Sequence, residues 1–439
     1  MNTATARYSA PARYSGSARY ASAARSTAVA RNAAAARSRV LWDSPLASYY
    51  LLVAATALLS VLGLVMVLSS STVRSITEGH SPYAQFFTQG RYALIGLAAM
   101  ALAINFPIRW IRALAWPAFF VAFALQSLTF IPAFALSKGG NTGWIYLPLI
   151  GNVQPAEVGK VALAIWLGRV LGKRQHELGY WRSVIAPGIG AALLIGLILG
   201  GHDLGTGMVV MLLVFGAFFV AGTPSKLLGL VGAAASAVVW YFFIHGQAGG
   251  NRIARIMATY NPNCDKQSEC FQAIHGRYAL ATGGLFGVGL GGSREKWNYL
   301  PEAHNDFIFA IIGEELGLLG TLMVLALFIA LGIAMARIIV RHPDPFVKIS
   351  TAAVATWVMG QALINIGVVI GLFPVIGLPL PLVSAGGSAL VTTMGALGMV
   401  INFSRHEPGA EEALAARPAV LRDSLTVVAP FARKRAFAH

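Results

Sequence analysis

The segment DFIFAIIGEELGLLGTLMVLALFIALGIAMAR, residues 306–337, decides the fold class of this chain. Its acidic residues, Asp306, Glu314 and Glu315, stand near its start, and a long apolar run follows them. A chain in hydrocarbon must pair its backbone groups internally, so this run predicts a transmembrane helix. Because about 20 residues suffice to cross a bilayer, roughly the first two turns are expected to project outward or to tilt within the protein.

The composition of the whole chain extends this interpretation. Of its 439 residues, 56% are hydrophobic and 11% are charged, and the mean hydropathy is +0.65. These values exclude an ordinary soluble domain. Apolar segments recur along the chain, and they predict an all-α polytopic membrane protein. We predict about ten transmembrane helices, at residues 48–69, 92–107, 114–132, 156–172, 184–200, 206–222, 227–245, 306–336, 350–371 and 388–404.

The basic residues of the short loops predict the orientation in the membrane, because Lys and Arg accumulate on the cytoplasmic side. The short loops of one side hold only Arg74, Arg91 and Lys138. The other side is therefore predicted to be cytoplasmic, together with both termini, and it holds Arg109, Arg112, Arg169, Lys173, Arg174, Arg182, Lys226, Arg337, Arg341 and Lys348. The large loop 246–305, between the seventh and eighth helices, then lies outside the cytoplasmic membrane. The net charge of +16 follows from this topology, and no nucleic-acid partner is expected.

Two tails flank the predicted ten-helix domain of residues 48–405. In residues 1–47, Ala-Arg pairs recur six residues apart, at Arg7, Arg13, Arg19, Arg25, Arg31 and Arg37. The Ser, Gly and Pro residues between them predict a disordered basic arm. This arm is either a solvated tail that enforces the topology or a segment that contacts anionic lipid headgroups or an acidic partner. Residues 406–439 are predicted to form a cytoplasmic C-terminal tail.

Both cysteines, Cys264 and Cys270, fall in the large outer loop. A disulfide that closes a small sub-loop is the natural interpretation in an oxidising compartment. Two free thiols are the alternative, and two sulfurs alone make a poor zinc site.

The stretch YLPEAHNDFIFAIIGEELG, Tyr299–Gly317, holds four of the 17 acidic residues. Asn305 is a suitable N-cap, which would put Asp306 in the first helical turn, where the helix dipole favours an anion while burial opposes it. A carboxylate that is ionised but poorly solvated is suited to act as a general base. The structural alternative is that Asp306 caps a helix and that Glu314 and Glu315 reach water. The neighbouring residues that favour a functional site are Arg294, Lys296, Glu302 and His304.

A second polar cluster, QPAEVGK, opens the fourth predicted helix at Gln154–Lys160. Glu157 and Lys160 are three residues apart, so they are neighbours on one helical face. They form either a structural ion pair or the lining of a cavity that presents Lys160 to an anion. Asp203, in GHDLGTG, raises the same question.

Two further segments interrupt the helical pattern. GGLFGVGLGGS, 283–293, contains a formal G-x-G-x-x-G, but it lacks the strand–turn–helix context of a dinucleotide site, so a tightly turning backbone near a substrate is the better account. NIGVVIGLFPVIGLPLPLVSAGG, 365–387, carries Pro374, Pro379 and Pro381. Non-helical backbone at that depth is tolerated where it is buried in protein or lines a wet cavity.

These same motifs carry a resemblance. Tyr299–Gly317, the Pro-rich segment through Ser388, QPAEVGK and HDLGTG resemble the SEDS family of cell-wall polymerases, which comprises FtsW, RodA and SpoVE, over about residues 48–405. The wording of Tyr299–Gly317 is more similar to FtsW, the division-associated branch, and the cysteine loop and Arg-rich tail suggest an actinobacterial version. The chain departs from the family at Trp144, which lacks a neighbouring arginine, and at Asn152, where some relatives have arginine.

The resemblance implies a peptidoglycan glycosyltransferase that polymerises lipid II at the outer face of the cytoplasmic membrane during septal wall synthesis. It implies a class B penicillin-binding protein and other divisome proteins as partners. Asp306 matches the family's essential aspartate, which would deprotonate the attacking sugar hydroxyl. The donor is an α-linked pyrophosphate and the product is β-linked, so a single inverting displacement suffices.

The pyrophosphate leaving group calls for cations or a divalent metal such as Mg²⁺ or Mn²⁺, and no organic cofactor is expected. Glu302 and Asp306 are the candidate metal ligands. The candidate substrate-binding residues are Glu157, Lys160, Arg277, Arg294, Lys296, Glu302, His304, Ser384, Gly386 and Gly387.

Three alternatives stay open. A lipid II flippase would suit the intramembrane charges, although the acidic cluster lies at the rim rather than at the midplane where transporters bind substrate. A non-catalytic divisome scaffold would use the tails. A RodA-type elongation polymerase would perform the same chemistry elsewhere in the cell.

Overall fold

All ten predicted apolar segments form helices in the structure, a computed structural model. It describes residues 44–77, 79–138, 141–147, 151–174, 177, 181–245, 270–297 and 299–415. The long helices are α2 (Ala47–Thr77), α3 (Ala84–Asn105), α5 (Ala115–Ser127), α6 (Pro155–Lys173), α7 (Trp181–Gly200), α8 (Leu204–Ala221), α9 (Ser225–His245), α12 (Ile308–Arg341), α13 (Pro345–Val369) and α14 (Gly387–Ser404). The shorter ones are α4 (Ile108–Ala113), the 3-10 helix η1 (Leu128–Phe130), α11 (Phe271–Gly283) and α15 (Ala410–Ala415).

Seven of the described helices are long and apolar enough to cross a membrane. Two more apolar stretches, Ala115–Phe130 and Ser225–Tyr241, are shorter. The one remaining predicted span, the fourth, is α6, which carries the charged residues Glu157 and Lys160 in its first turns. The fold is therefore that of a polytopic helical membrane protein, as predicted.

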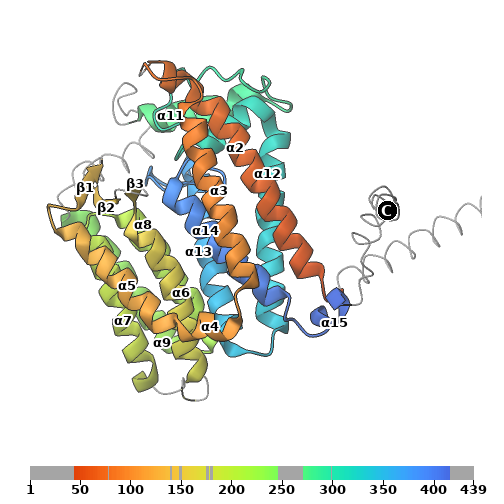
Figure 1. The fold of residues 1–439 in the computed structure, drawn as a ribbon. Helices are drawn as coiled ribbons and strands as arrows, with labels where there is room; N and C mark the ends of the chain where they lie inside the picture. The colour runs from red at the N-terminus through yellow and green to blue at the C-terminus, as the bar shows by residue number, and fades with distance from the viewer. Residues whose placement is uncertain are drawn as a thin grey trace, which may run out of the picture.

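The centre of the bundle is occupied by α13 and α14. In Figure 1 they lie between the group α5 to α9 and the pair α2 and α12. The helix α13 packs against α6, α8 and α12, while α14 packs against α3. Trp357 of α13 and Leu163 of α6 are fully buried, so the contact between α13 and α6 belongs to the core of the bundle.

Among the described residues, a small antiparallel sheet departs from the all-α prediction. Its strands β1 (Ala135–Lys138), β2 (Asn141–Leu147) and β3 (Gly151–Val153) follow each other in order. Ile145 of β2 is buried while the next residue, Tyr146, is exposed, which is the alternation of a strand with one covered face. The sequence signal was missed because the strands are short and lie within a glycine-containing loop.

The two ends of the bundle differ in character. One end carries α11, the small sheet, the non-helical segment 370–386 and the start of α12; we call it the Asp306 end (Figure 1). The other, which we call the basic end, carries α4, α15 and both ends of the described chain. There Arg112 of α4 pairs with Asp344 in the α12–α13 turn, and Arg337 donates to Ser48 Oγ at 3.3 Å. Arg169 of α6 also donates to the Arg112 carbonyl, so several basic residues that were predicted to share one side meet at this end.

The folded part extends beyond the predicted boundary at residue 405. Glu407 and Ala410 are buried, so the first residues of the predicted C-terminal tail pack against the bundle. The N-terminal Arg repeat, residues 246–269 with Cys264, and residues 416–439 lie outside the described residues. Cys270 is disulfide-bonded, and its pairing with Cys264 stays a prediction.

Candidate active site

Asp306 lies in a turn that immediately precedes α12. The helix begins at Ile308, with Phe307 at its N-cap position, so the prediction that Asn305 caps it and that Asp306 belongs to its first turn was wrong. Phe307 is fully buried, and Glu302 has a positive φ of 53°. Tertiary contacts, described next, determine this turn, whereas local capping propensity does not.

Three consecutive backbone carbonyls of this turn accept hydrogen bonds from the segment around residues 365–385. The backbone N–H of Ala385 donates to His304 O at 3.0 Å. Ser384 Oγ donates to Asn305 O at 2.6 Å. Asn365 Nδ2 donates to Asp306 O at 2.8 Å. The position of the Asp306 backbone is therefore set by residues that are distant in the sequence.

The Pro-rich segment also lines the carboxylate of Asp306. Gly377 has a φ of 78°, and a side chain added there would place its Cβ 3.4 Å from Asp306 Oδ2. The Arg277 side chain, from α11, lies beside Gly371 of the same segment, with its Cδ 3.6 Å from the corresponding Cβ position. Asp306 is half-buried and Arg277 is exposed. The segment thus contacts an anionic and a cationic side chain at the Asp306 end.

The helix α12 is broken at Gly317, where φ is 68° and ψ is −164°, a region open essentially to glycine alone. The break separates the carbonyls of Glu314 and Glu315 from the N–H groups of Leu318 and Leu319. The loop after α11 replaces these bonds. Val288 and Gly289 donate to the two carbonyls at 2.9 and 3.0 Å, and the two N–H groups donate to Gly284 O and Leu285 O at 2.9 and 3.3 Å.

This interlock explains the glycine-rich motif. A Cβ on Gly287 would lie 2.2 Å from Glu315 O, and one on Gly317 would lie 2.4 Å from Gly287 N. The motif forms a tight turn, as predicted, and this turn packs against α12.

Glu314 and Glu315 are fully buried, so the alternative in which they reach water was wrong. Glu314 accepts from Ser293 Oγ and from the Arg294 N–H. Glu315 pairs with Lys296 Nζ at 2.9 Å and accepts from Ser69 Oγ at 2.7 Å. These carboxylates hold residues 293–296 and α2 against the broken helix. Lys296 is correspondingly engaged in a structural pair.

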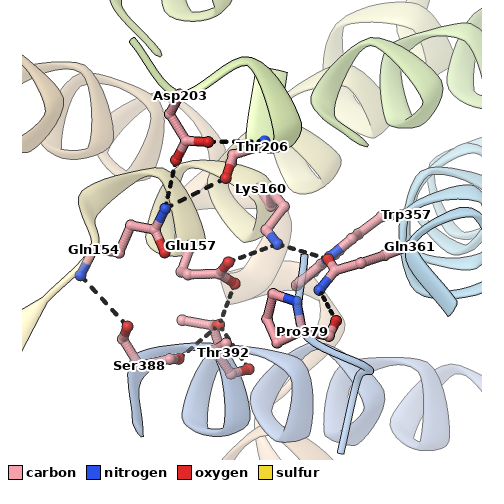
Figure 2. A network of polar contacts seen from close by, with 11 residues as sticks. Gln154, Glu157, Lys160, Asp203, Thr206, Trp357, Gln361, Pro379, Ser388 and Thr392 are labelled. Carbon is pink, nitrogen blue, oxygen red and sulfur yellow. Dashed lines mark hydrogen bonds and ion pairs between the residues drawn. The ribbon is translucent and has the colours of Figure 1, made fainter. Parts of the chain in front are cut away.

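The second polar cluster lies inside the bundle (Figure 2). Lys160 Nζ is 2.8 Å from Glu157 Oε1, and the two side chains are 2% and 4% exposed. The same ammonium donates to Gln361 Oε1 at 3.1 Å and stands 4.6 Å from the centre of the Trp357 ring. Gln361 Nε2 donates to Pro379 O at 2.8 Å. These contacts favour the structural interpretation of the Glu157–Lys160 pair.

The cluster extends through polar contacts to α14 and α8. Thr392 donates to Glu157 Oε2 at 3.3 Å. Gln154 Nε2 donates to Asp203 Oδ2 at 2.7 Å, and Asp203 accepts from the Thr206 N–H as the N-cap of α8 (Figure 2). Asp203 therefore serves as a helix cap.

Comparison with known proteins shows which family the chain belongs to. A family model for FtsW, RodA and SpoVE, described as cell cycle protein, matches residues 49–408. The chain is 40% identical over 373 residues to the "Probable peptidoglycan glycosyltransferase FtsW" of Mycobacterium tuberculosis, covering 85% of this chain and 70% of the relative.

This chain belongs to the FtsW/RodA/SpoVE family.

Two solved structures carry the same fold as this FtsW/RodA/SpoVE family member. A chain from a peptidoglycan synthase complex that coordinates polymerization and crosslinking matches with a TM-score of 0.65 and 25% identity, covering 81% of this chain and 96% of that one. The rod shape determining protein RodA of Thermus thermophilus matches with a TM-score of 0.60 and 25% identity, covering 81% and 96%.

The residues that the family resemblance indicated lie in several elements of the structure. Asp306, Glu302 and His304 share the turn before α12, and Arg277 of α11 lies beside Gly371 of the Pro-rich segment. Ser384 holds this turn in place, since it also accepts from the Leu380 N–H at 2.7 Å. Gly387 packs against Tyr92, because a Cβ there would lie 2.5 Å from the ring.

Two further candidates, Gly386 and Arg294, have structural contacts of their own. Gly386 is the N-cap residue of α14, and Arg294 is exposed while its backbone binds Glu314. Asn365 and Gln361 were missed as site residues. A polar side chain in an apolar helix was the available signal.

The predicted divalent cation would need oxygen donors from this FtsW/RodA/SpoVE family member or from its substrate. Within the described parts of the chain, no group of three or more His, Cys, Asp or Glu side chains gathers as a metal site. Mg²⁺ is commonly held by only one or two carboxylates together with substrate phosphates, so the Mg²⁺ or Mn²⁺ ion stays a prediction. Glu302 and Asp306 as its ligands also stay a prediction, and the proposed reaction does not pass through a metal ion.

Proposed function

We propose that this family member is a peptidoglycan glycosyltransferase that polymerises lipid II in cell division, with Asp306 as the general base. The names of its relatives support the reaction class. The observation that carries the residue assignment is the anchoring of the Asp306 turn through three consecutive carbonyls. A base must be held within hydrogen-bonding reach of the proton that it removes, and such anchoring supplies the required rigidity.

In the proposed reaction, the Asp306 carboxylate takes the proton of the acceptor sugar hydroxyl. The hydroxyl oxygen then forms the new bond to the anomeric carbon of the donor. The bond from that carbon to the pyrophosphate oxygen breaks, and the lipid pyrophosphate leaves as an anion. Inversion converts the α-linked donor into a β-linked product.

Developing charge on the leaving group needs nearby cations. Arg277 is our first candidate, because it is exposed and lies beside the segment that lines Asp306. Lys160 and Lys296 are weaker candidates, since each is already paired with a buried carboxylate. Their main role in this proposal is to hold the helices that shape the site.

We further propose that the Asp306 end faces outward and that the basic end is cytoplasmic, with both termini on that side. The distribution of Lys and Arg supports this orientation.

A class B penicillin-binding protein is the proposed partner at the septum. Its support is the resemblance to a chain of a complex that coordinates polymerization and crosslinking.

The decisive experiment is polymerisation of labelled lipid II by the purified protein together with its penicillin-binding partner. Wild type, Asp306→Asn and Glu302→Gln would be compared, each with a thermal-unfolding check. We expect polymer from wild type, and none from a folded Asp306→Asn variant. Equal polymer from wild type and Asp306→Asn would remove Asp306 as the base. If neither made polymer while both exchanged lipid II between leaflets, the flippase alternative would replace the proposal.

A further inference from the structure

The glycine-rich loop, defined here as residues 284–292, exposes apolar side chains at the Asp306 end. Its sequence, GLFGVGLGG, contains only glycine and apolar residues. Leu285, Phe286 and Leu290 are 61%, 78% and 61% exposed, and Val288 is also exposed. An exposed apolar group of this kind marks a site of interaction with a protein or a membrane.

The position of this loop along the membrane normal follows from α12. The helix between Gly317 and Arg337 is about 20 residues long, which is about 30 Å, the thickness of the hydrocarbon core. With Arg337 at the boundary of the basic end, Gly317 lies at the opposite boundary. The loop is hydrogen-bonded to α12 on both sides of Gly317, so it lies at the same level.

The apolar surface of the loop is continuous with the exposed face of α12. Leu318 and Leu319 are exposed, and their N–H groups donate to Gly284 O and Leu285 O. One turn further into the membrane, Leu322 is also exposed. Trp297 and Tyr299, aromatic residues of the kind enriched at bilayer interfaces, are exposed in the segment that follows the loop.

We propose that the glycine-rich loop is a membrane anchor that inserts its apolar side chains into the lipid leaflet at the Asp306 end. The occupant is phospholipid, because the loop lies at the edge of the hydrocarbon and continues the exposed face of a spanning helix. Through the interlock at Gly317, this anchor holds the first turns of α12, and hence the Asp306 turn, at a set depth. A site that acts on a lipid-anchored group needs such a fixed depth.

Site-directed spin labelling in phospholipid vesicles tests the anchor directly and does not depend on any enzymatic activity. Single cysteines would replace Phe286 and Leu290 in the full chain, and each would carry a nitroxide. Leu322→Cys, on the exposed face of α12, provides the reference within the hydrocarbon. Asn152→Cys, at the exposed middle position of β3, provides the aqueous reference. Collisions with oxygen report lipid, and collisions with a water-soluble nickel chelate report water.

We expect the labels at Phe286 and Leu290 to show oxygen-to-nickel accessibility ratios close to that at Leu322 and well above that at Asn152. Ratios equal to that at Asn152 would overturn the proposal, because the loop would then stand in water. Labels that are water-accessible alone and lose both kinds of collision when the penicillin-binding partner is added would also overturn it, in favour of a protein-docking surface. All four positions are exposed, so each variant should fold, which gel filtration and thermal unfolding would verify.

Discussion

Gln361 and Asn365 lie one turn apart on α13 and donate their side-chain amides to the consecutive carbonyls of Pro379 and Leu378, at 2.8 and 2.7 Å. Each side-chain amide also makes a second hydrogen bond. Gln361 accepts from Lys160, and Asn365 donates to the backbone of Asp306. Two turns of one central helix therefore join the buried ion pair, the Pro-rich segment and the candidate base into a single framework.

We expect Asn365→Ala to lower polymerisation by on the order of 100-fold, because a small displacement of a reacting group has an effect of that size. The substitution leaves the carbonyls of Asp306 and Leu378 without the amide donor. A lipid II polymerisation assay, normalised to folded protein, measures the effect.

Asn402 provides the matched control for Asn365. It is also 2% exposed, and its amide also donates to two backbone carbonyls, those of Ala103 and Phe106, at 2.9 and 2.6 Å. Asn402→Ala and Asn365→Ala should lower the free energy of unfolding by similar amounts, about 1–3 kcal/mol for each carbonyl that loses its donor. Its activity per folded molecule should stay close to wild type. Equal loss of activity in both variants would show that Asn365 acts only through overall stability.

Gly317→Ala should destabilise the protein by at least about 1–3 kcal/mol, since the backbone there adopts a conformation that alanine does not tolerate. The new Cβ would also lie 2.4 Å from Gly287 N. Gly188→Ala on α7 is the control, because no atom lies within 4 Å of its Cβ position. That control should be neutral or slightly stabilising. Thermal unfolding in detergent compares them, and an unchanged Gly317→Ala would contradict the interlock.

Lys160→Met should lower the free energy of unfolding by roughly 3–5 kcal/mol, because it leaves the Glu157 carboxylate buried without its cation. The double variant Glu157→Gln/Lys160→Met should recover part of this loss, since it removes the uncompensated charge. A double-mutant cycle by thermal or denaturant unfolding measures the coupling. If the double variant were less stable than Lys160→Met, the pair would not be the dominant interaction at this position.

Glu407 should make the basic end sensitive to pH. Burial raises the pKa of this carboxyl above its ordinary value of 4.5, while nearby Ser48 and the charges of Arg341 and Arg337 act in the opposite direction. A raised native pKa means that the folded state favours the protonated acid. The contribution of this group to stability is therefore fully present below pH 4.5 and is lost as the pH rises through the native pKa.

We accordingly expect Glu407→Gln to raise the unfolding temperature at about pH 7, and the difference to disappear as the pH falls below the ordinary carboxyl pKa. Unfolding temperatures recorded between about pH 4 and pH 8 would show this convergence. A lower unfolding temperature for Glu407→Gln at neutral pH would mean that the 4.0 Å contact with Arg341 outweighs the cost of burial.

Much of the candidate site could be predicted from the sequence, because its signals are local. Asp306, Glu302 and His304 stand out as a polar group beside an apolar helix, and Glu157 and Lys160 are neighbours by helical periodicity alone. The role of Asn365 could not be predicted in this way. Its partners, Asp306 and Leu378, are reached only when α12, α13 and the Pro-rich segment pack together.

The sequence by itself determined the fold class and the approximate bounds of all ten helices, because the length of an apolar run is set by the thickness of a bilayer and its helical form by the need to pair every backbone group. Only the tertiary structure decided the start of α12, the break at Gly317 and the burial of Glu314 and Glu315. At each of these positions a distant segment supplies hydrogen bonds or charges that outweigh local preference. Local patterns therefore predicted the elements, and long-range pairing of buried polar groups shaped the site between them.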